Sequence, residues 1–413
     1  MSRNALLLAL ALLALAPAGA LAKDDVYEVL YDVRMVPTER AARVVIRLGA
    51  NAHLVRELTL RIDPQRHFDF RGDGEVTVVD DSVHWKPPEA GGQLRYTFLV
   101  DHLRDDRSYD ARCTKTWALF RGDDLVPPTR SRVQKGARSH SLLRLRVPEG
   151  WSRATPYPLL RGGVYGVNHP HRGFDRPTGW FVVGHLGAVR EEVHGVEVAI
   201  AAPKKHGMRR LDMLALLRWT LPVLEDVLGE LPPRLLVVGA GDPMWRGGLS
   251  GPQSVYVHAR RPLIGEDGTS PLLHEVMHAL LGIRGGDGGD WVVEGLAELY
   301  AIEMLRRSGT LAEDRVERIY QKLATRGRRA AKLEVDSASG DVTARAVVAL
   351  RALDAEIRER SEGAHSLDEV VRRLTAQRDP VTTASLGDAV LEATGLDLGA
   401  FLRRLVRPQA SSR

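Results

Sequence analysis

The sequence is poor in cysteine and has almost no excess charge. Cys113 is the single thiol among 413 residues, so no disulfide can form within the chain, and no activating group near it indicates a nucleophile. Basic residues exceed acidic ones by only five, and single arginines spread along the expected helices do not form a nucleic-acid footprint. These absences indicate a globular protein held together by core packing, for which nucleic acid is not an expected partner.

Long apolar runs are also missing, except at the N-terminus. Arg3 is followed by an apolar run at 5–15 and then by Ala20-Leu21-Ala22, which places small residues at the −3 and −1 positions of a signal-peptidase site. Residues 1–22 are therefore expected to be a signal peptide cut after Ala22. We expect the mature chain to be secreted or periplasmic and to have no membrane span. An uncleaved N-terminal anchor is the alternative, because the run is rich in leucine.

The chain is long enough for two or three domains. Its first part alternates apolar and polar residues in short stretches separated by Pro, Gly and Asp, which is typical of an antiparallel β domain at 23–155. The expected strands of this domain are 26–34, 42–48, 55–62, 94–100 and 142–147. A loop-like segment at 156–178 precedes two more expected strands, 180–183 and 196–200, the second after a hairpin turn at His194-Gly195.

Helical periodicity replaces this alternation after residue 203. A helix is expected at 211–228, with Pro222 kinking it, followed by two short strands at 235–238 and 254–258. From Ser270 onward nearly all of the chain has a helical pattern. The expected helix signals are Ser270 and Pro271 at one start, Gly282 at its end, Asp290 as the next cap, and a capping box at 366–369.

The helix expected after Ser270 contains the sequence His274-Glu275-Val276-Met277-His278. Residues four apart lie on one helical face about one turn apart, so both imidazoles can reach a single ion. Glu275 lies about 100° further round, where it can hold a metal-bound water as catalytic base. Glu294 opens the next expected helix after a glycine-rich loop, which lets it face back toward the histidines. Two histidines and one glutamate leave the fourth position of Zn²⁺ open for water, which is a catalytic arrangement.

Glu298 follows Glu294 by one helical turn. At this spacing it is expected to accept a hydrogen bond from a ligating histidine. The alternative is that the whole pattern is accidental. Both histidines would then be ordinary side chains, Glu294 an acid stabilised by the helix dipole, and Glu298 a solvated residue.

With these residues the chain resembles the gluzincin zinc metallopeptidases, and within them the glycyl aminopeptidase family, relatives of the large zinc aminopeptidases. The likeness is carried by 270–282 around HEVMH and by 291–297, and less firmly by 353–358, 366–370 and 394–401. It implies a multidomain α+β fold, in which the N-terminal β domain is followed by a thermolysin-like catalytic domain at 156–309 and a helical C-terminal region at 310–408. The PDZ domain that such relatives often carry is not expected here.

The resemblance also implies site residues. Zinc ligation is carried onto His274, His278 and Glu294, and general-base action onto Glu275. Relatives bind the substrate's amino terminus with the acid of a Gly-Gly-x-Glu-like stretch, but the matching stretch here, 247–251, carries the uncharged Ser250. Gly248 and Ser250 are the substrate-binding candidates.

A second departure concerns the oxyanion. Where relatives place a tyrosine to stabilise it, this chain has Thr343; Tyr300, Tyr320 and His365 are the candidates to replace it. The strand 254–258 is expected to form the cleft edge along which an extended peptide lies.

The sequence therefore predicts zinc-dependent hydrolysis of a peptide or protein substrate by a metal-bound water, with Glu275 as general base. Ser250 and Thr343 motivate the alternative of a catalytically weak or inactive metallopeptidase-like binding or scaffold protein. A carbohydrate-binding β domain as the main function finds no aromatic cluster to support it.

Overall fold

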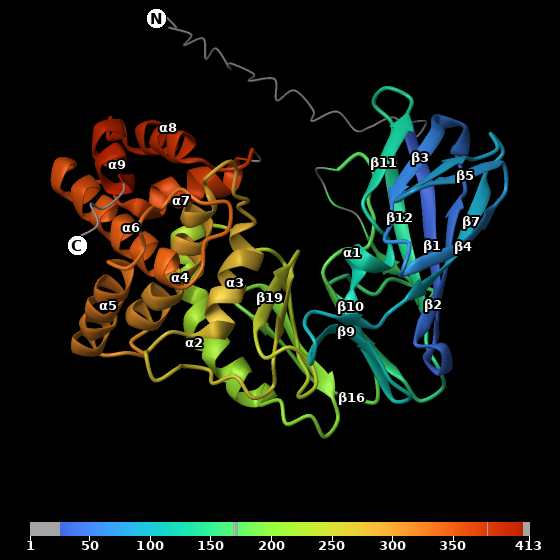
Figure 1. Cartoon of the computed structure of the whole chain (residues 1–413), viewed down its shortest axis with the longest axis horizontal. Coiled ribbons are helices and arrows are strands. Elements are labelled where there is room, and N and C mark those ends of the chain that lie inside the picture. Colours follow the sequence, from blue (N-terminus) through green and yellow to red (C-terminus); the bar gives the residue numbers. More distant parts are fainter. Residues whose placement is uncertain (1–24, 168, 170–171, 378, 408–413) are drawn as a thin grey trace, which may run out of the picture.

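The computed structural model describes residues 25–167, 169, 172–377 and 379–407. Figure 1 shows a β-rich half in blue and cyan, a central region of strands and helix α2 in green and yellow, and a helical half in orange and red. The predicted signal peptide lies outside the described residues. Within the described residues, no helix is both long and apolar enough to cross a membrane.

The β-rich half consists of three sheets among the described residues, with strand orders β14-β12-β1-β2-β7-β4, β13-β15-β10-β9-β8 and β11-β3-β6-β5. Alternate side chains of these strands form its core; in β1, for example, Tyr27, Val29, Tyr31 and Val33 are all buried. The strand bounds are β1 (Val26–Val36), β2 (Ala41–Leu48), β3 (Val55–Arg61), β4 (His67–Gly72), β5 (Glu75–Val79), β6 (Ser82–Lys86), β7 (Gly92–Leu99), β8 (His102–Leu103), β9 (Tyr109–Cys113), β10 (Trp117–Arg121), β11 (Thr129–Val133), β12 (Arg138–Arg146), β13 (Ser152–Ala154), β14 (Tyr165–Gly166) and β15 (Trp180–Gly184). A short helix, α1 (Gly122–Leu125), and two 3₁₀ turns, η2 (Pro37–Glu39) and η3 (Ala52–Leu54), connect some of them.

Strands β1 and β12 pair in parallel, with Leu30 opposite Leu142. The prediction of a wholly antiparallel domain was therefore wrong at this pair. Parallel neighbours need a long crossover, and the strands from β2 to β11 supply it. No local pattern marks such a pairing, because each strand alternates in the same way whichever direction its neighbour runs.

Strand pairing also crosses the predicted domain boundary between residues 155 and 156. Strand β15 lies between β13 and β10 and pairs antiparallel with both. Its Trp180 then packs on Tyr256 of the central sheet, and the Trp180 backbone N–H donates to Ser254 Oγ at 2.8 Å. The β-rich half thus shares a core with the sheet that carries the site. The proposed division of the chain into domains stays a prediction.

The central sheet has the strand order β16-β17-β18-β20-β19. Its bounds are β16 (Leu186–Val193), β17 (Val196–Pro203), β18 (Arg234–Val238), β19 (Gly248–Gly251) and β20 (Ser254–Val257). The predicted hairpin turn is present between β16 and β17, where His194 and Gly195 both have positive φ, as the turn's twist requires. Helix α2 (Arg210–Leu228) runs through Pro222 as one helix and packs on this sheet.

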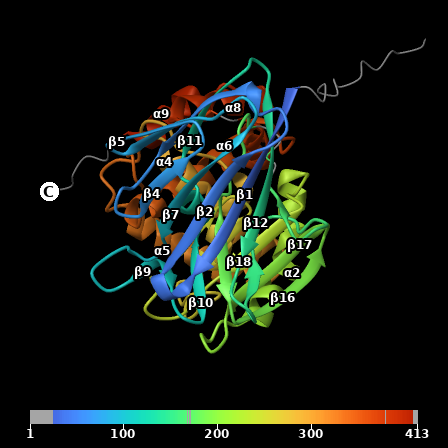
Figure 2. The ribbon, with the colours of Figure 1, turned by 90° about the vertical axis from the view of Figure 1, so that its right-hand side faces the viewer.

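The helical half packs against the other side of the site. Its elements are α3 (Pro271–Leu281), α4 (Asp290–Arg307), α5 (Glu313–Gly327), α6 (Asp341–Arg360), α7 (Leu367–Ala376), α8 (Thr383–Thr394) and α9 (Gly399–Val406). The predicted capping box of Ser366 and Glu369 starts α7. Viewed from the β-rich side, strands β1, β2 and β12 lie in front of these helices (Figure 2).

Asp290 does not cap helix α4, so that prediction was wrong. The helix begins at Asp290 itself, and Gly289 occupies the cap position without a side-chain hydrogen bond. The Asp290 carboxylate instead accepts from the backbone N–H of Ala338 at 2.7 Å. It thereby ties the start of α4 to the loop before α6.

Candidate metal centre

Helix α3 presents His274 and Glu275 to a cavity, with His278 one turn after His274, while its apolar residues face the core. Leu272, Leu273, Val276, Met277 and Leu281 are buried. As predicted, the helix begins with a cap, in which the Leu273 N–H donates to Ser270 Oγ at 3.3 Å, and ends at Gly282 in the left-handed conformation. The rotation of α3, and with it the direction of both imidazoles, is therefore fixed by burial and by its two ends.

Helix α4 brings Glu294 and Glu298 to the same cavity. Gly295 allows this, because a Cβ on it would lie 2.7 Å from the Ala346 Cβ of α6. The loop before α4 is held as well, since the Gly286 N–H donates to the Val381 carbonyl at 2.8 Å. At Gly289 a Cβ would lie 1.8 Å from that carbonyl, so glycine is required there for packing.

The three predicted ligands lie close together, although their helices are separate. One ligand atom each of His274, His278 and Glu294 falls within 4.8 Å of the others. The two Nε2 atoms are 3.1 Å apart, and the Glu294 oxygens lie 3.4 Å from His274 Nε2 and 3.3 Å from His278 Nε2. Ligands about 2.0–2.1 Å from a tetrahedral Zn²⁺ are themselves about 3.3 Å apart. The donor set therefore fits one zinc ion with a fourth position open.

The charges around His274 explain how it is held. Burial alone would lower the pKa of His274, but hydrogen bonds to Glu294 and Glu298 outweigh it and raise the pKa to about 10. Burial would raise the pKa of Glu294, but hydrogen bonds from both histidines bring it down to about 2. The Glu298 Oε2 lies 2.7 Å from His274 Nδ1, which leaves Nε2 to face the other donors. A metal ion would have to displace a proton from this cluster, so its affinity depends on pH.

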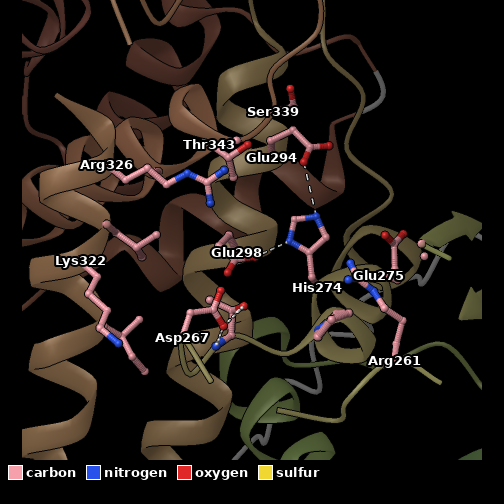
Figure 3. Close-up of a pocket in the computed structure, with 18 of the residues that line it drawn as sticks. Arg261, Asp267, His274, Glu275, Glu294, Glu298, Lys322, Arg326, Ser339 and Thr343 are labelled. Atoms are coloured by element: carbon pink, nitrogen blue, oxygen red, sulfur yellow. Dashed lines mark hydrogen bonds and ion pairs between the residues drawn. The ribbon is translucent and has the colours of Figure 1, made fainter. Parts of the chain in front are cut away.

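Glu275 lies on the far side of His274 from Glu298, against strand β19 (Figure 3). A Cβ placed on Gly248 would lie 2.6 Å from Glu275 Cγ and 2.9 Å from Oε1. Burial raises the pKa of Glu275, while the positive charges of the two histidines and a hydrogen bond from the Ser250 backbone lower it. Gly248 and Ser250, chosen from the sequence as substrate-binding candidates, thus both lie on β19 beside Glu275.

Of the three donors, His274 and Glu294 line a cavity of about 520 Å³ between β19, α3, α4, α5 and α6. Figure 3 shows Glu294 above His274 and Glu298 beside it, with Thr343 and Ser339 near Glu294 and Arg261 near Glu275. The basic residues that line the cavity are Arg246, Arg261, Lys322 and Arg326. None of the four could be predicted from the sequence, because they are single residues in separate segments without a motif.

None of the three residues considered as replacement oxyanion donors lines this cavity. Tyr300 donates to Asp368 at 2.8 Å and Tyr320 donates to Glu303 at 2.8 Å, so both hydroxyls are engaged elsewhere. His365 lies before α7, also outside the cavity lining. Thr343, at the position where relatives were expected to have tyrosine, does line it.

The edge of the sheet at the cavity is β19 and not β20. Strand β20 has β18 on one side and β19 on the other, so its backbone groups are already paired. The prediction that strand 254–258 forms the cleft edge was therefore wrong, because the neighbouring strand β19 forms it. At the cavity an extended peptide could add to β19, whose outer side has no strand neighbour among the described residues.

Trp245, which also lines the cavity, is held by the β-rich half. Its backbone N–H donates to the Tyr109 carbonyl at 2.8 Å, and the Tyr109 N–H donates to Pro243 at 3.0 Å. The Arg104 guanidinium stacks 4.0 Å from the centre of the Trp245 ring. Strand β9 and the turn before it thus position one wall of the site.

Comparison with known proteins finds structural relatives only. No protein-family model matches the sequence, and no curated protein matches it. The structure is similar to that of an aminopeptidase N family protein from Idiomarina loihiensis, with 15% identity, a TM-score of 0.70, and coverage of 93% of this chain and 77% of that one. An M1 zinc metallopeptidase from Deinococcus radiodurans is similar over 93% of both chains, with 15% identity and a TM-score of 0.59.

A point mutant of that Deinococcus enzyme gives 16% identity and a TM-score of 0.61, with 94% of this chain and 95% of that one covered. At such low identity the likeness concerns the fold. The chain has a multidomain α+β fold like that of M1 zinc metallopeptidases.

Proposed function

We propose that this chain is an exported zinc metallopeptidase that hydrolyses peptide bonds. The observation that carries the proposal is the set of distances of 3.1–3.4 Å among the facing donors of His274, His278 and Glu294, with Glu275 beside them. Such a set suits zinc with an open position better than a closed structural site. The fold likeness to M1 zinc metallopeptidases adds support. Export rests on the predicted signal peptide alone.

When bound, zinc would supply Lewis acidity to the scissile carbonyl and to the attacking water. Glu275 takes the proton from that water and passes it to the leaving amine nitrogen. Burial raises the pKa of Glu275, and a raised pKa suits both taking the proton and passing it on. A carboxylate with an ordinary pKa would hold the proton too weakly. Glu298 keeps the His274 ring oriented through Nδ1. The wall of Gly248 and the Ser250 backbone keeps Glu275 in place.

The first test is metal content together with activity. We expect one zinc per chain, and hydrolysis of a broad peptide library that is abolished by Glu275→Gln while zinc is retained. Glu317→Gln is the matched control, because Glu317 is an exposed residue of α5 whose side chain pairs with Arg351. A protein that binds no zinc, or a Glu275→Gln variant as active as the wild type, would refute the proposal.

An inactive binding or scaffold protein is the second candidate. The observation that favours it is that neither Tyr300 nor Tyr320 reaches the cavity, so no phenol of these two is available for the oxyanion. A zinc-loaded protein that is inert toward the whole library but retains a partner protein would favour this candidate.

A further inference from the structure

Acidic and basic side chains occupy different parts of the cavity wall. Of the four carboxylates that line it, Glu275, Glu294 and Glu298 surround the metal position, where a bound cation would offset them. Asp267 is the remaining acid of the lining. Four basic side chains occupy the rest of the wall, so a substrate that reaches this part of the cavity meets more bases than acids.

Two of these four bases are already paired. Both Arg246 nitrogens that face Asp242 donate to its carboxylate at 2.8 Å, and Arg326 Nε donates to Asp341 at 2.9 Å. Arg261 and Lys322 differ, because neither forms a side-chain hydrogen bond or salt bridge within the described part of the chain. They are therefore the cations available to a ligand.

Arg261 and Lys322 face the same space from two different segments. Arg261 follows β20 and Lys322 lies on α5, and Figure 3 shows them on opposite sides of the cavity with Asp267 between them. Both also line an adjoining hollow beside Pro271. Two cations that line the same space can both attract one carboxylate, since each offers several N–H donors.

The same wall offers little to a substrate's ammonium group. Asp267 uses Oδ1 to accept from the Thr269 N–H at 3.1 Å and the Thr269 hydroxyl at 3.0 Å. Glu266 also lines the adjoining hollow but not the main cavity. Ser250, on the strand beside Glu275, has no charge. A free amino terminus would therefore meet more repulsion than attraction.

We propose that Arg261 and Lys322 form a subsite for a substrate carboxylate, so that the protein selects peptides by negative charge and not by a free amino terminus. The inference deepens the proposed function and rests on it. The carboxylate belongs either to an acidic side chain or to the peptide's C-terminus, and the chemistry of recognition is the same for both.

The test measures binding without hydrolysis. Zinc-loaded Glu275→Gln protein is titrated by fluorescence anisotropy with four short labelled peptides of otherwise identical sequence. One is acetylated and amidated with a central Gln, the second has Glu in its place, the third keeps Gln but has a free C-terminal carboxylate, and the fourth keeps Gln but has a free amino terminus. We expect the second or third peptide to bind about fivefold more tightly than the first at low salt. The preference should shrink as salt rises, because both cations are exposed.

The same titrations are repeated on Arg261→Gln and Lys322→Gln in that background. Each should lower the preference for the carboxylate, and the double variant should bind the charged and neutral peptides within about twofold of each other. Arg318→Gln is the control, because Arg318 lies one turn before Lys322 on α5, pairs with Asp314 and does not line the cavity. It should keep the full preference.

The outcomes separate this inference from the proposed function. A preference for Glu assigns the subsite to an acidic side chain, and a preference for the free acid assigns it to the C-terminus. Equal binding of the first three peptides, tightest binding of the peptide with the free amino terminus, or a preference that survives in the double variant overturns the inference. Hydrolysis by wild-type protein is then measured on the same peptides. Cleavage without a charge preference refutes the subsite only, and a charge preference without cleavage refutes the peptidase only.

Discussion

Replacing Gly248 by alanine tests how closely Glu275 is held against strand β19. The added Cβ would lie 2.6 Å from Glu275 Cγ and 2.9 Å from its Oε1, whereas ordinary contacts of a Cβ begin at 3.4 Å. The backbone of Gly248 is outside the left-handed region, so alanine can adopt it without strain. The nearest three atoms that the new Cβ meets all belong to Glu275, so this side chain has to move.

The distances set the size of the effect. Relieving a contact of 2.6 Å requires a shift of about 1 Å, and a misplacement of that size in a reacting group costs about 100-fold in rate. Zinc should stay, because His274, His278 and Glu294 are held by α3 and α4 and not by β19. We expect kcat to fall about 100-fold and the zinc content to remain one per chain.

The assay is peptide hydrolysis at saturating substrate, with zinc measured on the same samples. Gly173→Ala is the control, since a Cβ there meets nothing within 4 Å. In a Glu275→Gln background, Gly248→Ala should add little further loss, because both changes act on one group. The reasoning is refuted if Gly248→Ala keeps kcat within twofold of wild type, or if its effect multiplies fully with that of Glu275→Gln.

Three further changes follow from particular contacts. Glu298→Gln should weaken zinc binding about 10–100-fold in a chelator competition, because it removes the charge 2.7 Å from His274 Nδ1; an unchanged affinity would contradict this role. Asp175→Asn should stabilise the protein at pH 8 by up to about 3 kcal/mol and not at pH 4, as measured by urea unfolding. Burial raises the pKa of Asp175 from 3.8 to about 6, so the stability that its neutral form contributes is lost as pH rises through that value; equal effects at both pH values would contradict this. Ser270→Ala should cost about 1 kcal/mol of unfolding free energy and Ser270→Gly only a few tenths, because both remove the hydroxyl that accepts from the Leu273 N–H but glycine is the better tolerated cap residue; the reverse order would contradict it.

Local features of the site were predictable from the sequence. The HEVMH spacing, the Ser270 cap, the Gly282 end and the turn at His194-Gly195 each depend on residues a few positions apart. Within one helix or turn the backbone has few conformations, so the relative positions of residues a few places apart follow from the sequence. Even the meeting of Glu294 with the two histidines followed from a short loop between two helices.

The features that only the tertiary structure decided depend on residues far apart in the chain. The parallel pairing of β1 with β12, the place of β15 beside β10, and the identity of β19 as the edge strand depend on which strands meet, and alternation does not encode that. The contact of Gly248 with Glu275 and the presence of Arg261 and Lys322 in one cavity depend in the same way on the packing of separate elements. The sequence determined where a metal could be held, because its donors lie on two consecutive helices. The packing of distant segments decided what surrounds that position, and hence which substrates the cavity would favour.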